Sequence, residues 1–139
     1  MSTAAVAEAI KKTTQATLDA LNNWDYDALV AVRADNFVFQ GLPRSLQQPA
    51  LDNDGFKDLW FNFMTPAFTS FKIEPMHMTH DAEALKSTMY GTVSTTTSAG
   101  LRTCEIVQMF SFHETGEKML RLDELFDSKV YLEMIEEMK

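Results

Sequence analysis

The chain has 139 residues and a formal net charge of −8 at pH 7. This length fits one domain, residues 1–139, and the acidic balance disfavours nucleic acid and anionic membranes as partners, because both attract basic patches. Hydrophobic residues make up 45% of the chain, which has only five glycines and four prolines, so we expect a folded globular protein.

Cysteine content and the N-terminal residues bear on location. Cys104 is the single cysteine of the sequence, which favours a reducing compartment. Residues 1–10 lack a basic segment followed by an apolar core, and no apolar run reaches the roughly 18 residues of a membrane span. We therefore expect a cytoplasmic protein with no membrane partner.

Helical spacing of apolar residues marks the first part of the chain. Ser2 or Thr3 is expected to cap a first helix that ends near residues 22–23. Asp25 is a cap for a second, shorter helix, and Arg33 falls on the inward face of that helix. A cation on an apolar face needs a buried partner.

A short strand and a third helix follow. The strand is predicted at residues 37–40, and the cap signal for the helix lies at residues 52–55. The helix carries an aromatic stripe that includes Trp60 and Phe63 and is expected to stop at residues 65–66, because proline disfavours a continuing helix. This stripe belongs to the core and is also suited to form the wall of a cavity.

From residue 68 the apolar period changes from helical to two, which is typical of strands. Short connections between the strands imply antiparallel neighbours, and Asp127 or Ser128 is the expected cap of a final helix. The pattern therefore predicts an α+β domain whose helices cover one face of a sheet. The predicted strands are residues 69–79, 84–97, 101–112 and 118–126.

Glu124 is the candidate at the centre of the site. Alternation in the last strand places Glu124 on the same face as Leu122 and Phe126, and a carboxylate in an apolar row must be paired, hydrogen-bonded or protonated. Pairing with Arg33 is the simplest solution. One interpretation is a structural ion pair, and the other is an acid or base (Glu124) beside a group that stabilises negative charge (Arg33).

The preceding strand contributes a second candidate row. Arg102, Cys104 and Ile106 share one face, with polar members toward one end, which we interpret as the mouth of a pocket. The alternative is that Arg102 extends to water from the end of the strand. Cys104 is interpreted as a packing residue, because no histidine is placed beside it.

The histidines and Tyr90 complete the set of candidates. His80 is a candidate to act beside Glu124 or a histidine next to a surface turn, and Tyr90 either donates a hydrogen bond to substrate or packs. His77 and His80 are three apart on a strand and therefore point to opposite faces, while His113 lies in a predicted turn. With no cysteine cluster or helical histidine motif, we predict no metal site.

Several short motifs resemble one protein family. They are residues 23–29 near the start, Arg33, residues 42–46, residues 80–84 and residues 123–128. Together with the order of the elements, they resemble the SnoaL-like group of the NTF2-like superfamily. They are especially similar to the small fungal NTF2-like isomerases and cyclases of secondary metabolism, which include meroterpenoid isomerases and the brevianamide semipinacolase.

The resemblance implies a cone-shaped roll, in which a curved antiparallel sheet wraps around helices and a central pocket. In the semipinacolase type an arginine, two tyrosines and a glutamate line this pocket. Arg33 and Glu124 match two of these positions, whereas the sequence carries Arg102 and Ile106 at the tyrosine positions. The implied protein is a pocket enzyme that needs no cofactor and acts on a small polycyclic substrate.

We therefore expect an isomerase or cyclase that rearranges a polycyclic alkaloid, meroterpenoid or polyketide intermediate by acid–base catalysis. Glu124, Arg33 and His80 are the expected catalytic residues. Two alternatives stay open: a hydrolase or dehydratase that uses the same carboxylate, and a non-catalytic NTF2-like binding or dimerisation module. A cavity filled by side chains, with Arg33 and Glu124 locked together, would favour the module. The expected substrate-binding residues are Arg102, Ile106, Tyr90, Trp60 and Phe63.

The sheet face opposite the pocket is expected to be apolar. An apolar face of this kind on a soluble domain is typical of a partner surface, and members of the family commonly dimerise through the sheet, so we expect a homodimer. The alternative is that the C-terminal helix folds back over this face. Its predicted members are Leu85, Met89, Val93, Leu101, Val107, Met109, Met119 and Leu125.

Overall fold

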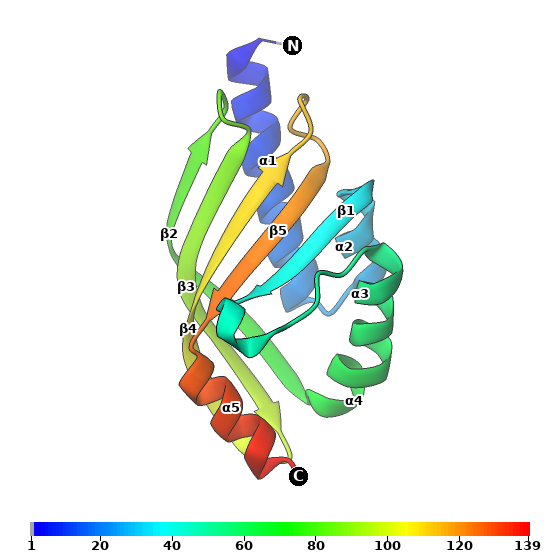
Figure 1. The fold of residues 1–139 in the computed structure, drawn as a ribbon. Coiled ribbons are helices and arrows are strands. Elements are labelled where there is room, and N and C mark those ends of the chain that lie inside the picture. Colours follow the sequence, from blue (N-terminus) through cyan, green and yellow to red (C-terminus); the bar gives the residue numbers. More distant parts are fainter. Residues whose placement is uncertain (1) are drawn as a thin grey trace.

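A curved five-stranded sheet with helices on its inner side forms the molecule (Figure 1). The computed structural model describes residues 2–139. The strand order is β1-β5-β4-β3-β2. Strands β2 to β5 pair as antiparallel neighbours, and β1 pairs with β5 in parallel. This confirms the predicted α+β class. The strands are β1 (Arg33–Leu42), β2 (Ser70–Asp81), β3 (Lys86–Thr97), β4 (Gly100–Phe112) and β5 (Met119–Phe126).

The helices enclose one side of this sheet. In Figure 1 α1 runs behind the sheet, α3 and α4 lie beside β1, and α5 lies at the end of the sheet near the C-terminus. None of the helices that residues 2–139 form is both long enough and apolar enough to cross a membrane. Their bounds are α1 (Thr3–Asn22), α2 (Tyr26–Ala31), the 3₁₀ turn η1 (Arg44–Leu46), α3 (Asn53–Leu59), the π-type turn η2 (Trp60–Met64), α4 (Thr65–Ala67) and α5 (Ser128–Glu137).

The first helix is fixed at both of its ends. The Ser2 side chain accepts a hydrogen bond from the Ala5 backbone N–H, which satisfies one free donor of the first turn. At the other end the Asn22 side chain donates to the Ile73 carbonyl at 3.0 Å and accepts from the Ile73 N–H at 2.7 Å. These two bonds fix the end of α1 to β2 on the inner side of the sheet.

The second helix is shorter than the sequence pattern predicts. Asp25 caps it as expected, but α2 ends at Ala31 and Arg33 is the first residue of β1. The chain leaves the helix because the Val32 carbonyl accepts a hydrogen bond from the Met119 N–H at 2.8 Å, which joins this segment to β5. Arg33 is still buried, as predicted, but it projects from a strand.

The third helical segment is longer than predicted. Its helical path continues from α3 through η2 into α4 and ends at Ala67, so the expected stop at residues 65–66 is wrong. Pro66 lies directly after the π-type turn η2, in the last residues of this helical path. The segment therefore presents aromatic side chains over a longer stretch of the inner sheet face.

The orientation of β3 is opposite to the prediction. Met89 is fully buried, Val93 faces the inner side, and Tyr90 therefore lies on the outer face. Threonine and serine occur on both faces of this strand, so alternation alone does not identify the inner one. Met119 is also buried, because the register between β4 and β5 shifts next to Phe112. Neither methionine belongs to an exposed apolar face.

Candidate active site

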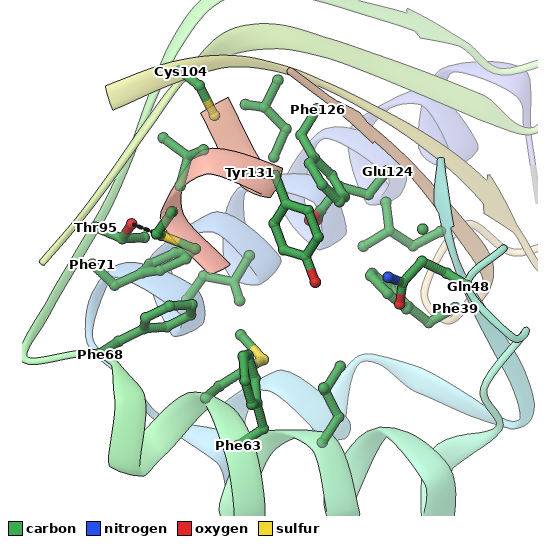
Figure 2. Close-up of a pocket in the computed structure, with 18 of the residues that line it drawn as sticks. Phe39, Gln48, Phe63, Phe68, Phe71, Thr95, Cys104, Glu124, Phe126 and Tyr131 are labelled. Carbon is green, nitrogen blue, oxygen red and sulfur yellow. Dashed lines mark hydrogen bonds between the residues drawn. The ribbon is translucent and has the colours of Figure 1, made fainter. Parts of the chain in front are cut away.

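A cavity of about 170 Å³ opens between the inner sheet face, the segment from α3 to α4, and α5. A neighbouring depression of about 270 Å³ shares Phe39, Gln48 and Phe63 with it. A mostly apolar lining with a few polar groups is the usual setting of a small-molecule site. In Figure 2 Phe63 rises from the helical segment below, and Tyr131 extends from α5 into the open space.

Glu124 projects from β5 into this cavity. It lies directly opposite Gln108 of β4, and the Gln108 Nε2 donates a hydrogen bond to Glu124 Oε2 at 2.9 Å. Burial raises the pKa of Glu124 above its ordinary value, while the hydrogen bond from Gln108 and the positive charge of Arg33 act in the opposite direction. Such a carboxyl group is suited to exchange protons nearer neutral pH than an exposed one.

Arg33 lies in the wall of the same cavity, with only 5% of its surface exposed. Its guanidinium lies between the rings of Phe37 and Phe56, with its central carbon 4.2 Å and 4.1 Å from the two ring centroids. Burial lowers the pKa of Arg33 to about 10, so it stays charged at neutral pH. Its Nε and Nη1 atoms are buried and have no hydrogen-bond partner among residues 2–139.

The predicted ion pair between Arg33 and Glu124 does not form. No nitrogen of Arg33 lies within 4.0 Å of a Glu124 oxygen among the contacts of residues 2–139, although the two charges still influence each other's pKa. The physical reason is that the two aromatic rings hold the guanidinium on β1 while Gln108 holds the carboxyl on β5. Space therefore remains beside both groups.

Three of the predicted substrate-binding residues line the cavity. Ile106 and Arg102 come from β4, and Phe63 comes from η2. Arg102 also forms an ion pair with Glu137, which links β4 to α5. The predicted contribution of Phe63 to the core is limited, since 38% of its surface is exposed. These positions are consistent with contact to a bound molecule, while their roles stay predictions.

Trp60, Tyr90 and His80 do not line the cavity, and the expectation that they do is wrong. Trp60 stacks on Trp24 at a centroid distance of 4.0 Å and is buried in the core. Tyr90 lies on the outer sheet face, where its hydroxyl donates to Glu105 at 2.5 Å. These placements follow from long-range packing and from the reversed faces of β3, which local spacing does not reveal.

His80 faces the inner side of the sheet but is not among the residues that line the cavity. Its Nδ1 is 2.7 Å from the hydroxyl of Ser87, near the start of β3. Strands β3 and β4 lie between His80 on β2 and Glu124 on β5, and neighbouring strands are roughly 4.8 Å apart. Burial and the nearby charge of Lys11 lower the pKa of His80. The structure therefore gives no support to a direct role of His80 beside Glu124.

Several residues of the site were not predicted from the sequence. Gln108 follows Ile106 by two residues on the same strand face, and its pairing with Glu124 was not predicted. Phe126 and Tyr131 pack edge to face beside the cavity, with 5.0 Å between their ring centroids. The place of Phe126 in the cavity was predictable, because it follows Glu124 by two residues and so shares its strand face. Gln48 comes from the loop before α3 and had no periodic signal.

The lining is suited to a largely apolar ligand that carries a few oxygen atoms. Most lining residues are aliphatic or aromatic, and the charged members are Arg33, Arg102 and Glu124. Among residues 2–139, no group of three or more histidine, cysteine or acidic side chains is arranged to hold a metal ion. The chemistry that these side chains can supply is proton exchange at Glu124 and charge stabilisation at Arg33.

A curved sheet that wraps around helices and a cavity is typical of the NTF2-like fold. Comparison of the whole chain with solved structures agrees: the BvnE pinacolase from Penicillium brevicompactum superimposes with a TM-score of 0.89 at 22% identity, covering 99% of this chain and 95% of that one. No family model matches the sequence.

Sequence relatives identify the family more closely. Core atranone cluster protein 11 of Stachybotrys chlorohalonatus is 33% identical over 120 residues, covering 86% of this chain and 89% of that protein. An ergochrome gene cluster protein of Claviceps purpurea is 28% identical over 124 residues, covering 89% of this chain and 80% of that protein. The chain belongs to the same family as the atranone cluster protein, and its fold is NTF2-like.

Proposed function

We propose that the protein is an acid–base isomerase or cyclase that rearranges a polycyclic, oxygenated intermediate of fungal secondary metabolism without a cofactor. The observation that carries this proposal is Glu124, a carboxyl group with a raised pKa that lines an apolar cavity without an ion-pair partner. Relatives from the atranone and ergochrome gene clusters support the metabolic setting. The fold shared with a pinacolase supports the reaction class.

The proposed roles follow from charge and position. Glu124 takes a proton from one atom of the substrate and returns it at another, so the reaction consumes no net proton. The Arg33 guanidinium stabilises the negative charge that develops on a substrate oxygen, and low local polarity strengthens this interaction. Aromatic side chains exclude water and hold the ring system. The aromatic side chains that Figure 2 labels around the cavity are Phe39, Phe63, Phe68, Phe71, Phe126 and Tyr131.

The open cavity favours an enzyme over a non-catalytic module. A module has no need for a charged pair held apart beside empty space, since buried charges are costly and contribute little net stability. Here two aromatic rings hold Arg33, and Gln108 holds Glu124. Burying these two groups apart lowers the stability of the fold, because they do not form a close ion pair.

The test begins with inactivation of the gene in the cell that produces the protein. The compound that accumulates is then incubated with the purified protein, and the product is analysed by mass spectrometry. An isomerase or cyclase gives a product of unchanged mass. A dehydratase gives a product that has lost one water, and a hydrolase gives products that together have gained one. No conversion of any accumulated compound would contradict an enzymatic role.

A further inference from the structure

Gln108 supports Glu124 from outside the cavity. The two residues are direct partners in the ladder between β4 and β5, and the Gln108 Nε2 donates to Glu124 Oε2 at 2.9 Å. Gln108 has no exposed surface and is not among the residues that line the cavity. A substrate in the cavity therefore meets Glu124 but not Gln108.

The second polar atom of the Gln108 amide has no partner. Its Oε1 is buried and accepts no hydrogen bond from residues 2–139. A buried acceptor without a donor is costly, and native proteins contain few of them. An ionised Glu124 cannot supply the missing donor, because a carboxylate only accepts, whereas a protonated carboxyl group has one O–H to donate.

An amide is suited to both states of such a neighbour. Rotation about its last side-chain bond exchanges the NH₂ group and the oxygen. With the NH₂ group toward Glu124, Gln108 donates to the carboxylate, and with the oxygen toward Glu124 it accepts from the carboxylic acid. The rotation breaks no other bond of Oε1, because that atom has no partner to lose. An arginine or lysine in the same place would stabilise the ionised form alone.

We propose that Gln108 is a positioning residue that holds the Glu124 side chain in place in both of its protonation states through rotation of its amide. The inference rests on the proposed function, in which Glu124 alternates between these two states. In this proposal the carboxyl group of Glu124 keeps its orientation while its proton leaves and returns. An amide that does not titrate is able to follow the carboxyl group without contributing a charge of its own.

Other groups around Glu124 do not explain its positioning. The other charged or titratable residues of the cavity lining are Arg33 from β1, Arg102 and Cys104 from β4, and Tyr131 from α5. Within residues 2–139, none of them forms a hydrogen bond with Glu124, while Gln108 does. Arg33 acts on the pKa of Glu124 through its charge alone.

The first test uses the unmodified protein, labelled with ¹³C and ¹⁵N, and NMR spectroscopy over a pH series. The carboxyl carbon of Glu124 reports its titration, and Glu124→Gln assigns the signal. We expect the side-chain amide resonances of Gln108 to shift with the same midpoint as the Glu124 carboxyl carbon. Amide resonances of Gln108 that stay constant through the titration of Glu124 would overturn the proposal.

The second test removes the amide. Gln108→Met keeps the length and the unbranched shape of the side chain but removes the hydrogen bond to the charged form of Glu124. We expect the midpoint of the Glu124 titration to rise by about one pH unit, the size that a lost hydrogen bond to a charged group produces. Phe110→Leu is the matched control, since Phe110 is buried on the same strand face. It should leave the midpoint unchanged.

These outcomes separate the two proposals. An unchanged midpoint in Gln108→Met would overturn the positioning role even if Glu124 proves to be catalytic. If the amide responds as expected but Glu124→Gln turns over the true substrate at the normal rate, the proposed function fails and the hydrogen-bond coupling stands. The measurements on the unmodified protein remain decisive if Gln108→Met does not fold.

Discussion

Arg33 and Glu124 line one cavity without forming an ion pair, because aromatic rings hold one residue and an amide holds the other. The arrangement leaves a cation and a carboxyl group available to the same ligand. Each still affects the other at longer range: the charge of Arg33 lowers the pKa of Glu124, and burial raises it. Substitution of either side chain should therefore change both the titration of Glu124 and the activity.

Arg33→Ala should raise the pKa of Glu124 further and abolish most activity. The variant loses the positive charge of Arg33, which opposes the effect of burial on Glu124, and it also loses the group proposed to stabilise a substrate oxygen. NMR titration of the Glu124 carboxyl carbon measures the first effect. A Glu124 titration that is identical in Arg33→Ala and in the parent protein would contradict the coupling.

Arg33→Lys should restore the charge but not full activity. The planar guanidinium stacks between Phe37 and Phe56, and a lysine ammonium has neither its shape nor its set of donors. We therefore expect the Glu124 titration to return toward that of the parent while turnover stays reduced by roughly tenfold or more, the loss that follows when one favourable contact to the transition state weakens by about 1.4 kcal/mol. Full turnover in Arg33→Lys would argue against a specific role for the guanidinium.

The raised pKa of Glu124 should make stability depend on pH. Between the ordinary value of 4.5 and the higher value in the folded protein, the native state binds more protons at this site than the unfolded state does. The contribution of Glu124 to the free energy of unfolding is therefore largest at low pH and falls as pH rises through this window. Glu124→Gln removes this contribution.

Urea unfolding of the parent protein and of Glu124→Gln over pH 4 to 8 measures this effect. The stability of the variant relative to the parent should increase with pH and then level off above the pKa of Glu124 in the folded protein. Asp123→Asn is a suitable control, because Asp123 lies on the outer face in an exposed ion pair with Arg121. A difference between Glu124→Gln and the parent that is constant over the whole range would contradict a raised pKa.

The outer face of the sheet carries exposed apolar side chains that are suited to contact a second copy of the chain. Leu101 and Leu125 are 63% and 39% exposed there, and Val107 lies between Tyr90 and Leu125 in the strand register. We propose that this face mediates a homodimer. The predicted surface is corrected in four places, because Met89, Val93 and Met119 face inward and Leu85 packs against the core.

Light scattering at micromolar concentration tests the dimer. The unmodified protein should show twice the chain mass of 15.7 kDa, and Val107→Lys should show the mass of one chain. Gln15→Lys, at an exposed position of helix α1 on the other side of the sheet, should leave the dimer intact. A mass of one chain for the unmodified protein would contradict the proposal.

The helix caps and the inward orientation of Glu124 were predictable because both depend on local rules. Ser2, Asp25 and Asp127 cap helices as their side-chain chemistry predicts. Glu124 lies between Leu122 and Phe126 in an alternation that allows only one buried face. The resemblance to the NTF2-like superfamily predicted the curved sheet, and the structure confirms it.

Other features depend on contacts between distant segments and were not readable locally. Because threonine occurs on both faces of β3, alternation predicted the wrong inner face, and the structure places Tyr90 on the outer face. Arg33 was recognised as buried, but its aromatic partners come from β1 and α3. Gln108 is paired with Glu124 through the register of two strands, which alternation alone does not specify.

The most direct test of the account is turnover of the true substrate by Glu124→Gln. Glutamine keeps the shape of the side chain but cannot exchange a proton as a carboxyl group does, so turnover should fall by roughly 10²–10⁴, the usual contribution of a positioned acid or base. Circular dichroism should show an unchanged fold, and Asp123→Asn should retain the activity of the parent protein. Turnover of Glu124→Gln at the parent rate would contradict the central claim that Glu124 carries the proton.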